Sequence, residues 1–131
     1  MSIIGKRTDR KKPKPVLKPL TWLASTKKDL MSLPEEVIDI FGYALHLAQR
    51  GLKHPDAKPL HGFGAGVLEV VESWEGDAYR AVYVVRFEST VFVLHVFKKK
   101  SVKAGETPKP DLELIRKRLK VAEEIAGEQR K

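Results

Sequence analysis

Three apolar segments follow one another closely along the chain, and they restrict the possible fold more than any other feature of the sequence. They cover residues 66–73, 78–87 and 90–97, and they are rich in the Val, Phe and Tyr that favour β-strands. Only the short polar breaks WEGD and ES separate them. Parallel neighbours need a long crossover, so such short breaks favour antiparallel pairing. The sequence therefore predicts an antiparallel meander.

The segments on either side of this meander predict further elements. Residues 19–24 alternate enough to form a first strand, and residues 25–50 have the apolar periodicity of a helical hairpin. Residues 51–66 contain four Gly and two Pro and predict a loop. A last helix is expected to begin at Thr107 or Asp111.

The expected order of elements is thus β-α-α-β-β-β-α, which belongs to the α+β class. We expect a four-stranded, mainly antiparallel sheet with the helical hairpin on one face, and a C-terminal helix. The other face of the sheet is expected to be partly open.

The length of 131 residues suits one domain, which we expect to span residues 18–126. Residues 1–17 predict a flexible basic arm, because Pro13 and Pro15 block regular structure and the run of charges resists collapse. This arm is either a solvated tail or a contact to nucleic acid or the ribosome. Residues 127–131 are expected to form a short tail.

Positive charge is concentrated in two segments of the chain. Residues 1–18 hold seven Lys or Arg and one Asp, and residues 98–120 hold nine basic and three acidic side chains. The intervening residues 19–97 hold seven basic and ten acidic side chains. Basic segments of this kind attract phosphates or an acidic protein partner, although charge also serves solubility.

Several classes of function lack support in the sequence. There is no cysteine, which excludes disulfides and thiolate metal sites and fits a cytoplasmic protein. No secretory signal and no run of about 20 apolar residues is present, so we expect no membrane contact. No Walker loop, HExxH or GxSxG motif occurs. We therefore expect neither a metal nor a cofactor, since ligand-like spacing is absent among the histidines, which are His46, His54, His61 and His95.

Basic side chains remain as the candidates for chemistry, beginning with Arg80 in the middle of a predicted strand. Alternation along that strand groups Arg80 with Arg86 on one face, while the other face is entirely apolar or aromatic and should form the core. Arg80 is therefore expected to point to the open face. It is either a surface residue paired with an acid such as Glu69 or a guanidinium that binds a phosphate.

Three lysines follow the next strand directly. Alternation places Lys98 and Lys100 on one face and Lys99 on the other face, together with His95. They form either a charged strand end that discourages edge pairing or, with Arg80, part of a phosphate site near one edge. A lysine can act as a base only if its pKa is lowered, and clustered lysines are one route to that.

The segment YRAVYVVRFESTVFVLHVFKKKSVKAGETP resembles the signature of the RelE/HigB-type toxins of bacterial type II toxin–antitoxin systems, and most closely their phage-derived branch. The resemblance spans about residues 18–122. It is carried by Val67-Leu68-Glu69, Tyr79-Arg80-Ala81-Val82-Tyr83, Leu94-His95-Val96-Phe97-Lys98-Lys99, Thr107-Pro108 and Arg118.

The resemblance implies a RelE-like fold and a ribosome-dependent mRNA endonuclease. It also implies that a helix-turn-helix antitoxin neutralises the enzyme, and that the enzyme binds operator DNA only through this antitoxin. Such enzymes need no metal, because the 2′-OH of the RNA attacks the scissile phosphate. The resemblance implies catalytic roles for Arg80, Lys98 and Lys99, and it includes Arg118 in the last helix. We predict His95 as a further catalytic residue, and the residues predicted to bind RNA are Lys100, His61, Arg86 and Arg118, with Lys100 contributing only general attraction. His61 is also a candidate for proton transfer, like His95. Two alternatives are a non-catalytic nucleic-acid-binding module on the same scaffold and a protein-docking role for the open face.

Overall fold

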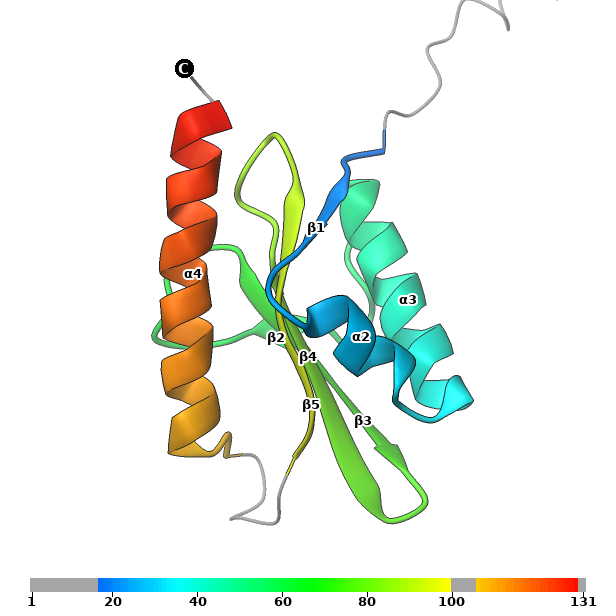
Figure 1. Ribbon diagram of the computed structural model, residues 1–131. Coiled ribbons are helices and arrows are strands. Elements are labelled where there is room, and N and C mark those ends of the chain that lie inside the picture. The colour runs from blue at the N-terminus through cyan, green and yellow to red at the C-terminus, as the bar shows by residue number, and fades with distance from the viewer. Residues whose placement is uncertain (1–16, 100–105, 130–131) are drawn as a thin grey trace, which may run out of the picture.

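The computed structural model describes residues 17–99 and 106–129, which form one sheet flanked by helices (Figure 1). The predicted arm, apart from Leu17, lies outside these residues, and so does Lys100. The elements in chain order are β1 (Leu20–Trp22), α2 (Thr26–Met31), α3 (Glu35–Gln49), β2 (Lys58–Pro59), β3 (Val67–Trp74), β4 (Asp77–Val84), β5 (Val91–Lys99) and α4 (Lys109–Gln129).

The mixed α+β class and the central meander are confirmed. The strand order is β1-β5-β4-β3-β2, and both β3–β4 and β4–β5 pair antiparallel. The helical hairpin is also confirmed as α2 and α3, and the apolar face of α3 is buried in the core through Val37, Phe41, Ala44 and Ala48.

The prediction of four strands is wrong, because the described residues form a mixed sheet of five strands. The mainly antiparallel pairing is confirmed, since three of the four strand pairings are antiparallel. β1 pairs parallel with the distant β5. The additional strand, β2, lies in the segment predicted to be a loop and pairs antiparallel with β3, with Lys58 opposite Glu69. Two residues are too few to show an alternating pattern, and Pro59 is tolerated because β2 is an edge strand.

The prediction of a partly open sheet face is also wrong, because α4 covers it (Figure 1). Val82, Phe92 and Leu94 on this face form a second core with Ile115 and Ala122 of α4. The central strands are apolar on both faces, so each face must be shielded from water. α4 also extends to Gln129, beyond the predicted domain end at residue 126.

A register shift in the β4–β5 ladder decides which face each residue of β5 occupies. Val82 is opposite His95, but the next residue of β4, Tyr83, is opposite Val93. The extra residue is a β-bulge that reverses the alternation along β5. As a result His95, Phe97 and Lys99 lie on the α4 side, as Phe92 does before the bulge.

Candidate functional site

Arg80 is buried beneath the start of α4 and does not point to an open face as predicted. Its side chain is 3% exposed, and its Nη1 donates hydrogen bonds to Glu69 Oε2 at 2.7 Å and to Thr107 Oγ1 at 2.8 Å. The interpretation of Arg80 as paired with Glu69 is therefore confirmed, although both partners are buried. The reason for the difference is that the segment leading into α4 lies over this end of β4.

Arg80 lies at a surface hollow of about 340 Å³ between β2, β3, β4 and the start of α4. The polar side chains that line it are Lys58, His61, Glu69, Arg80 and Thr107. Buried polar groups are nearly always hydrogen-bonded, yet the buried Nε of Arg80 is without a partner among the residues that the structure describes. The hollow thus has a buried, oriented guanidinium with a donor still to be satisfied.

Further cations surround this guanidinium and its carboxylate. Lys58 Nζ is 3.9 Å from Glu69 Oε1. Lys99 is opposite Ala78, two residues from Arg80, and therefore lies on the same face of the sheet. Desolvation, and after it the positive charge of Arg80, lowers the pKa of Lys99, while Glu106 and Glu69 oppose that shift. Three cations thus surround one buried carboxylate, a setting that favours an anion.

Lys98 does not join this group, so its predicted convergence with Arg80 is wrong. It is opposite Tyr79 on the face covered by the helical hairpin, and its Nζ lies 3.1 Å from Asp77 Oδ2. The hydrogen bond to Asp77 raises the pKa of Lys98. The alternation that separated Lys99 from Lys98 is confirmed, and the sheet register assigns Lys99 to the Arg80 side.

His95 is on the same face of the sheet as Arg80, but its side chain contacts α4. Its Nε2 is 2.8 Å from Asp111 Oδ1, and its ring stacks on Phe97 with centroids 4.2 Å apart. Arg118 Nη1 donates to the Leu94 carbonyl at 2.9 Å and lies 3.4 Å from His95 Nδ1. Desolvation lowers the pKa of His95 and outweighs the opposing effect of Asp111. Both His95 and Arg118 therefore join α4 to β5.

The other two predicted residues lie in different places. His61 lines the hollow with Arg80 and is exposed. Arg86 follows the end of β4, where its Nη2 is 2.7 Å from Glu123 Oε2 and its Nη1 donates to the Ala65 carbonyl at 3.2 Å. The backbone approaches it closely, since a Cβ at Gly66 would lie 2.8 Å from the Arg86 Cβ. Arg86 thus anchors α4 far along the helix from the hollow.

Sequence reasoning did not identify Lys58 and Thr107 as site residues, and it treated Glu69 only as a partner of Arg80. Thr107 precedes a proline at the start of a helix, a signal that indicated a helix start but not a contact to β4. Lys58 had no signal, because β2 is too short to recognise. All three reach the hollow only through the pairing of distant segments.

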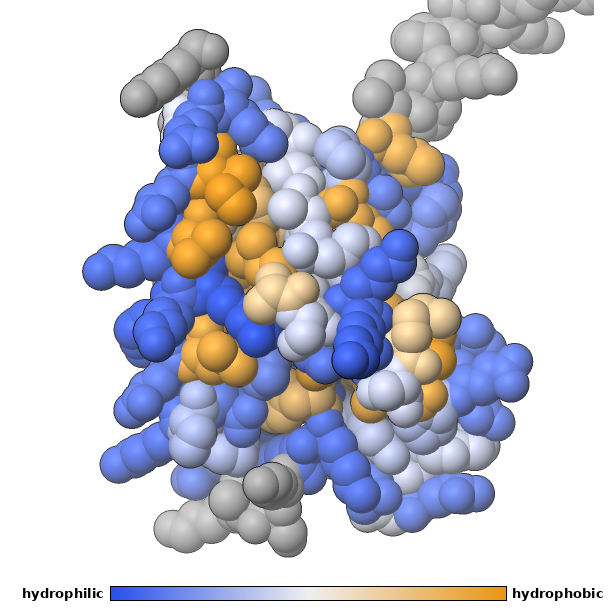
Figure 2. All heavy atoms as spheres, in the orientation of Figure 1, coloured by the Kyte–Doolittle hydropathy of each residue, from blue (hydrophilic) through white to orange (hydrophobic). Residues whose placement is uncertain are grey.

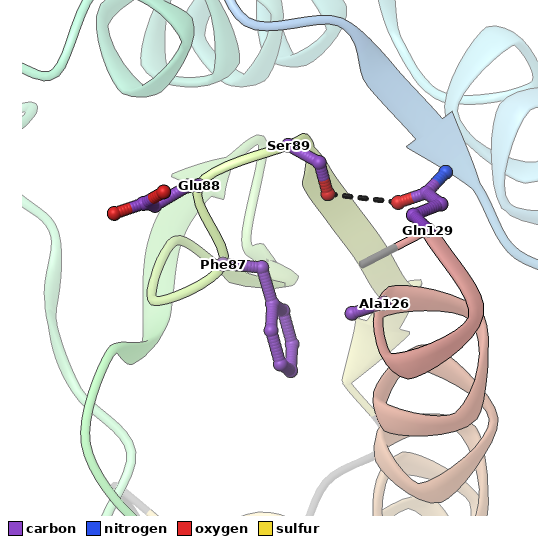
Figure 3. A pocket seen from close by; sticks show the side chains of 5 residues that line it. All are labelled: Phe87, Glu88, Ser89, Ala126 and Gln129. Atoms are coloured by element: carbon purple, nitrogen blue, oxygen red, sulfur yellow. Dashed lines mark hydrogen bonds between the residues drawn. The ribbon is translucent and has the colours of Figure 1, made fainter. Parts of the chain in front are cut away.

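A smaller hollow of about 270 Å³ lies near the other end of α4, beside Phe87, Ser89 and Gln129 (Figure 3). Ser89 Oγ donates to Gln129 Oε1 at 2.7 Å, and the side chain of Glu88 points away from Gln129. No cation is among the residues that line this hollow, so it is poorly suited to an anion.

Residues 28–120 match the family described as Phage derived protein Gp49-like (DUF891). The match covers more than half of the chain. It includes β3, β4, β5 and all the residues that line the hollow at Arg80. The chain belongs to the phage-derived Gp49-like family. No curated protein matches this Gp49-like chain significantly.

In residues 17–99 and 106–129 no helix is long and apolar enough to cross a membrane. The same residues contain no group of three or more His, Cys, Asp or Glu side chains that could hold a metal ion.

Proposed function

We propose that this Gp49-like protein is the toxin of a type II toxin–antitoxin system, of the RelE/HigB type. In this proposal it cleaves mRNA on the ribosome without a metal, and a helix-turn-helix antitoxin neutralises it. Membership of a phage-derived family is consistent with a toxin role. The observation that carries the proposal is the buried, oriented Arg80 at a hollow lined by Lys58 and His61, with Lys99 on the same face of the sheet.

Arg80 would stabilise the charge that develops on the scissile phosphate. Attack by the 2′-OH on phosphorus concentrates negative charge on the non-bridging oxygens in the transition state, and guanidinium N–H groups bind such oxygens well. Glu69 and Thr107 already hold the guanidinium in place, so little reorganisation is needed during the reaction. Lys58 adds positive charge at the same hollow, and Lys99 adds positive charge on the same face of the sheet.

Two groups at the hollow are suited to move the protons. Glu69 would accept the proton of the 2′-OH while the bond from O2′ to phosphorus forms. Protonated His61 would give a proton to the 5′-oxygen while its bond to phosphorus breaks, which leaves a cyclic phosphate. His95 is assigned no proton transfer, because its Nε2 is engaged with Asp111.

Adjacent lysines on opposite faces of β5 provide a matched test. We expect brief induction of the native protein to arrest growth and to create new mRNA 5′ ends. Lys99→Met should reduce the yield of these ends at least about tenfold, as loss of one stabilising charge commonly does. Lys98→Met should leave the yield unchanged, since Lys98 lies on the other face. Absence of new ends with the native protein, or equal effects of the two substitutions, would overturn the proposal.

One observation favours a second candidate, a nucleic-acid-binding module that does not cleave. Arg80 Nη1 already donates to both Glu69 and Thr107, so this nitrogen is not free to stabilise the charge that develops on a phosphate in a cleavage reaction. Such a module would bind RNA with a strong salt dependence and produce no new mRNA ends. Mapping mRNA ends after induction separates the two candidates.

A further inference from the structure

A larger hollow, of about 480 Å³, continues along α4 from the one that contains Arg80. His61 lines the first hollow, and the next two residues, Gly62 and Phe63, line the second. On α4, Leu112 lines the first and Glu113 lines the second. The two hollows therefore share the same two walls, the segment that enters β3 and α4, which lie against each other in Figure 1. Together they form one groove.

The second hollow carries an excess of positive charge. Three cations from two adjacent turns of α4 line it, namely Arg116, Lys117 and Lys120. Glu123 at its far end is already paired with Arg86 at 2.7 Å, which leaves Glu113 to oppose the three cations. Hydrophilic side chains project along the outer side of α4 in Figure 2. The groove is therefore complementary to a chain of anions.

Arg116 gives this hollow a charged wall. Its guanidinium lies over the ring of Phe63, 4.6 Å from the ring centroid, and its Nη1 donates to the Gly62 carbonyl at 3.4 Å. Phe63 is buried, so the guanidinium lies over a ring that is fixed in place. The outer surface of a guanidinium held in this way is a plane on which an unpaired nucleobase stacks.

We propose that the groove binds the single-stranded RNA segment that adjoins the phosphate at Arg80. One base stacks on Arg116, and Lys117 and Lys120 contact backbone phosphates. The identity of the bound strand rests on the proposed function, whereas its placement rests on the continuity of the hollows, the charge and the stacked guanidinium. An acidic peptide would share the charge complementarity but would not need a plane for stacking, so the geometry points to RNA.

The test uses a 12-nucleotide single-stranded RNA of mixed sequence, labelled with fluorescein and methylated at every 2′-oxygen. Methylation removes the nucleophile, so binding is measured in the full-length protein without cleavage. The groove variant is Arg116→Gln with Lys117→Gln and Lys120→Gln. The control is Lys27→Gln with Lys28→Gln and Lys53→Gln, which removes the same charge from exposed positions outside the groove. Thermal melts of both variants should match that of the native protein.

Fluorescence anisotropy between 50 and 300 mM salt gives the affinity and its salt dependence. The logarithm of the association constant falls linearly with log salt, and each phosphate that a variant no longer binds should make this slope shallower by about 0.7. At 0.1 M salt this corresponds to about a fivefold rise in Kd. The groove variant should show this weakening and the control should not. Arg116→Lys keeps the charge but removes the plane, so it should raise Kd several-fold and leave the slope unchanged.

Each outcome bears on the proposals separately. Equal Kd and slope in the groove variant and the native protein would overturn the inference, and so would absence of binding to the native protein. Tighter binding of a 12-residue poly-Glu peptide through the same residues would overturn it in favour of an acidic protein partner. Binding through the groove without new mRNA ends on induction would reject the proposed function but support the groove. New mRNA ends on induction, together with unchanged RNA binding by the groove variant, would support the proposed function but reject the groove.

Discussion

At the scale of single residues, the Arg80–Glu69 pair decides what can be changed without unfolding the protein. Both side chains are buried, and Thr107 and Lys58 complete their surroundings. Removing one member of a buried ion pair leaves the other charge unsatisfied, which is strongly destabilising. A loss of the proposed toxicity in Arg80→Ala alone would therefore report on folding as well as on chemistry.

We predict that Arg80→Met lowers the free energy of unfolding by about 3–5 kcal/mol, because the buried Glu69 carboxylate loses its 2.7 Å partner and keeps the more distant, exposed Lys58 beside it. Combining it with Glu69→Gln should recover most of that loss, since a neutral amide costs less to bury. Urea denaturation of the two single variants and the double variant measures the coupling. Losses that simply add would contradict a direct interaction between the two side chains.

His95 should make stability depend on pH. Desolvation holds its pKa in the folded protein below the value of about 6.5 expected in the unfolded chain. The folded state therefore binds a proton less readily, so the stabilising contribution is full above about pH 6.5 and is lost as the pH falls towards the folded pKa. We expect His95→Gln to lose less stability than the native protein between pH 7.5 and pH 5.5.

Chemical denaturation of both proteins at the two pH values checks this prediction. Asp111, Arg118 and Asp29 also act on the imidazole, but they are present in both proteins. An equal loss of stability in His95→Gln and the native protein would show that His95 does not titrate in this range.

At the scale of elements, α4 turns a sheet with one covered face into a three-layer domain. Ile115 is fully buried against the α4 face of the sheet, while His95 and Arg118 join the same helix to β5 by polar contacts. The start of this helix also provides Thr107 to the hollow. α4 is therefore both the cover of the second core and one wall of the candidate site.

Truncating Ile115 to Ala should cost about 2–5 kcal/mol of unfolding free energy, because it removes buried methylene groups and leaves a cavity under α4. Val121→Ala on the same helix is the matched control, since Val121 is 44% exposed. Its effect should stay within about 0.5 kcal/mol. Similar losses in both variants would mean that α4 does not pack on the sheet as described.

At the scale of the whole molecule, the basic segments and the folded body contribute separately. The described residues 17–99 and 106–129 contain both hydrophobic cores and all five strands of the sheet. Residues 1–16 contain six Lys or Arg and one Asp, and sequence reasoning expects them to add charge rather than packing.

We predict that deleting residues 1–16 leaves the thermal midpoint and the cooperativity of unfolding unchanged, because the described residues contain both hydrophobic cores. The same deletion should flatten the salt dependence of RNA binding if the arm contacts phosphates. Calorimetry and the anisotropy titration measure the two effects. Loss of the cooperative transition would show that the first residues are part of the folded unit.

The local pattern of the sequence determined the meander, the helical hairpin and the separation of Lys99 from Lys98, because alternation and helical periodicity are properties of neighbouring residues. Tertiary structure alone decided that α4 covers the second face, that β2 joins the edge and that the bulge in β5 turns His95 towards α4. Each of these depends on contacts between distant segments, and no local pattern encodes them. Arg80 was visible in the sequence, but only the meeting of β2, β3, β4 and α4 buries its guanidinium beside Glu69 and Thr107.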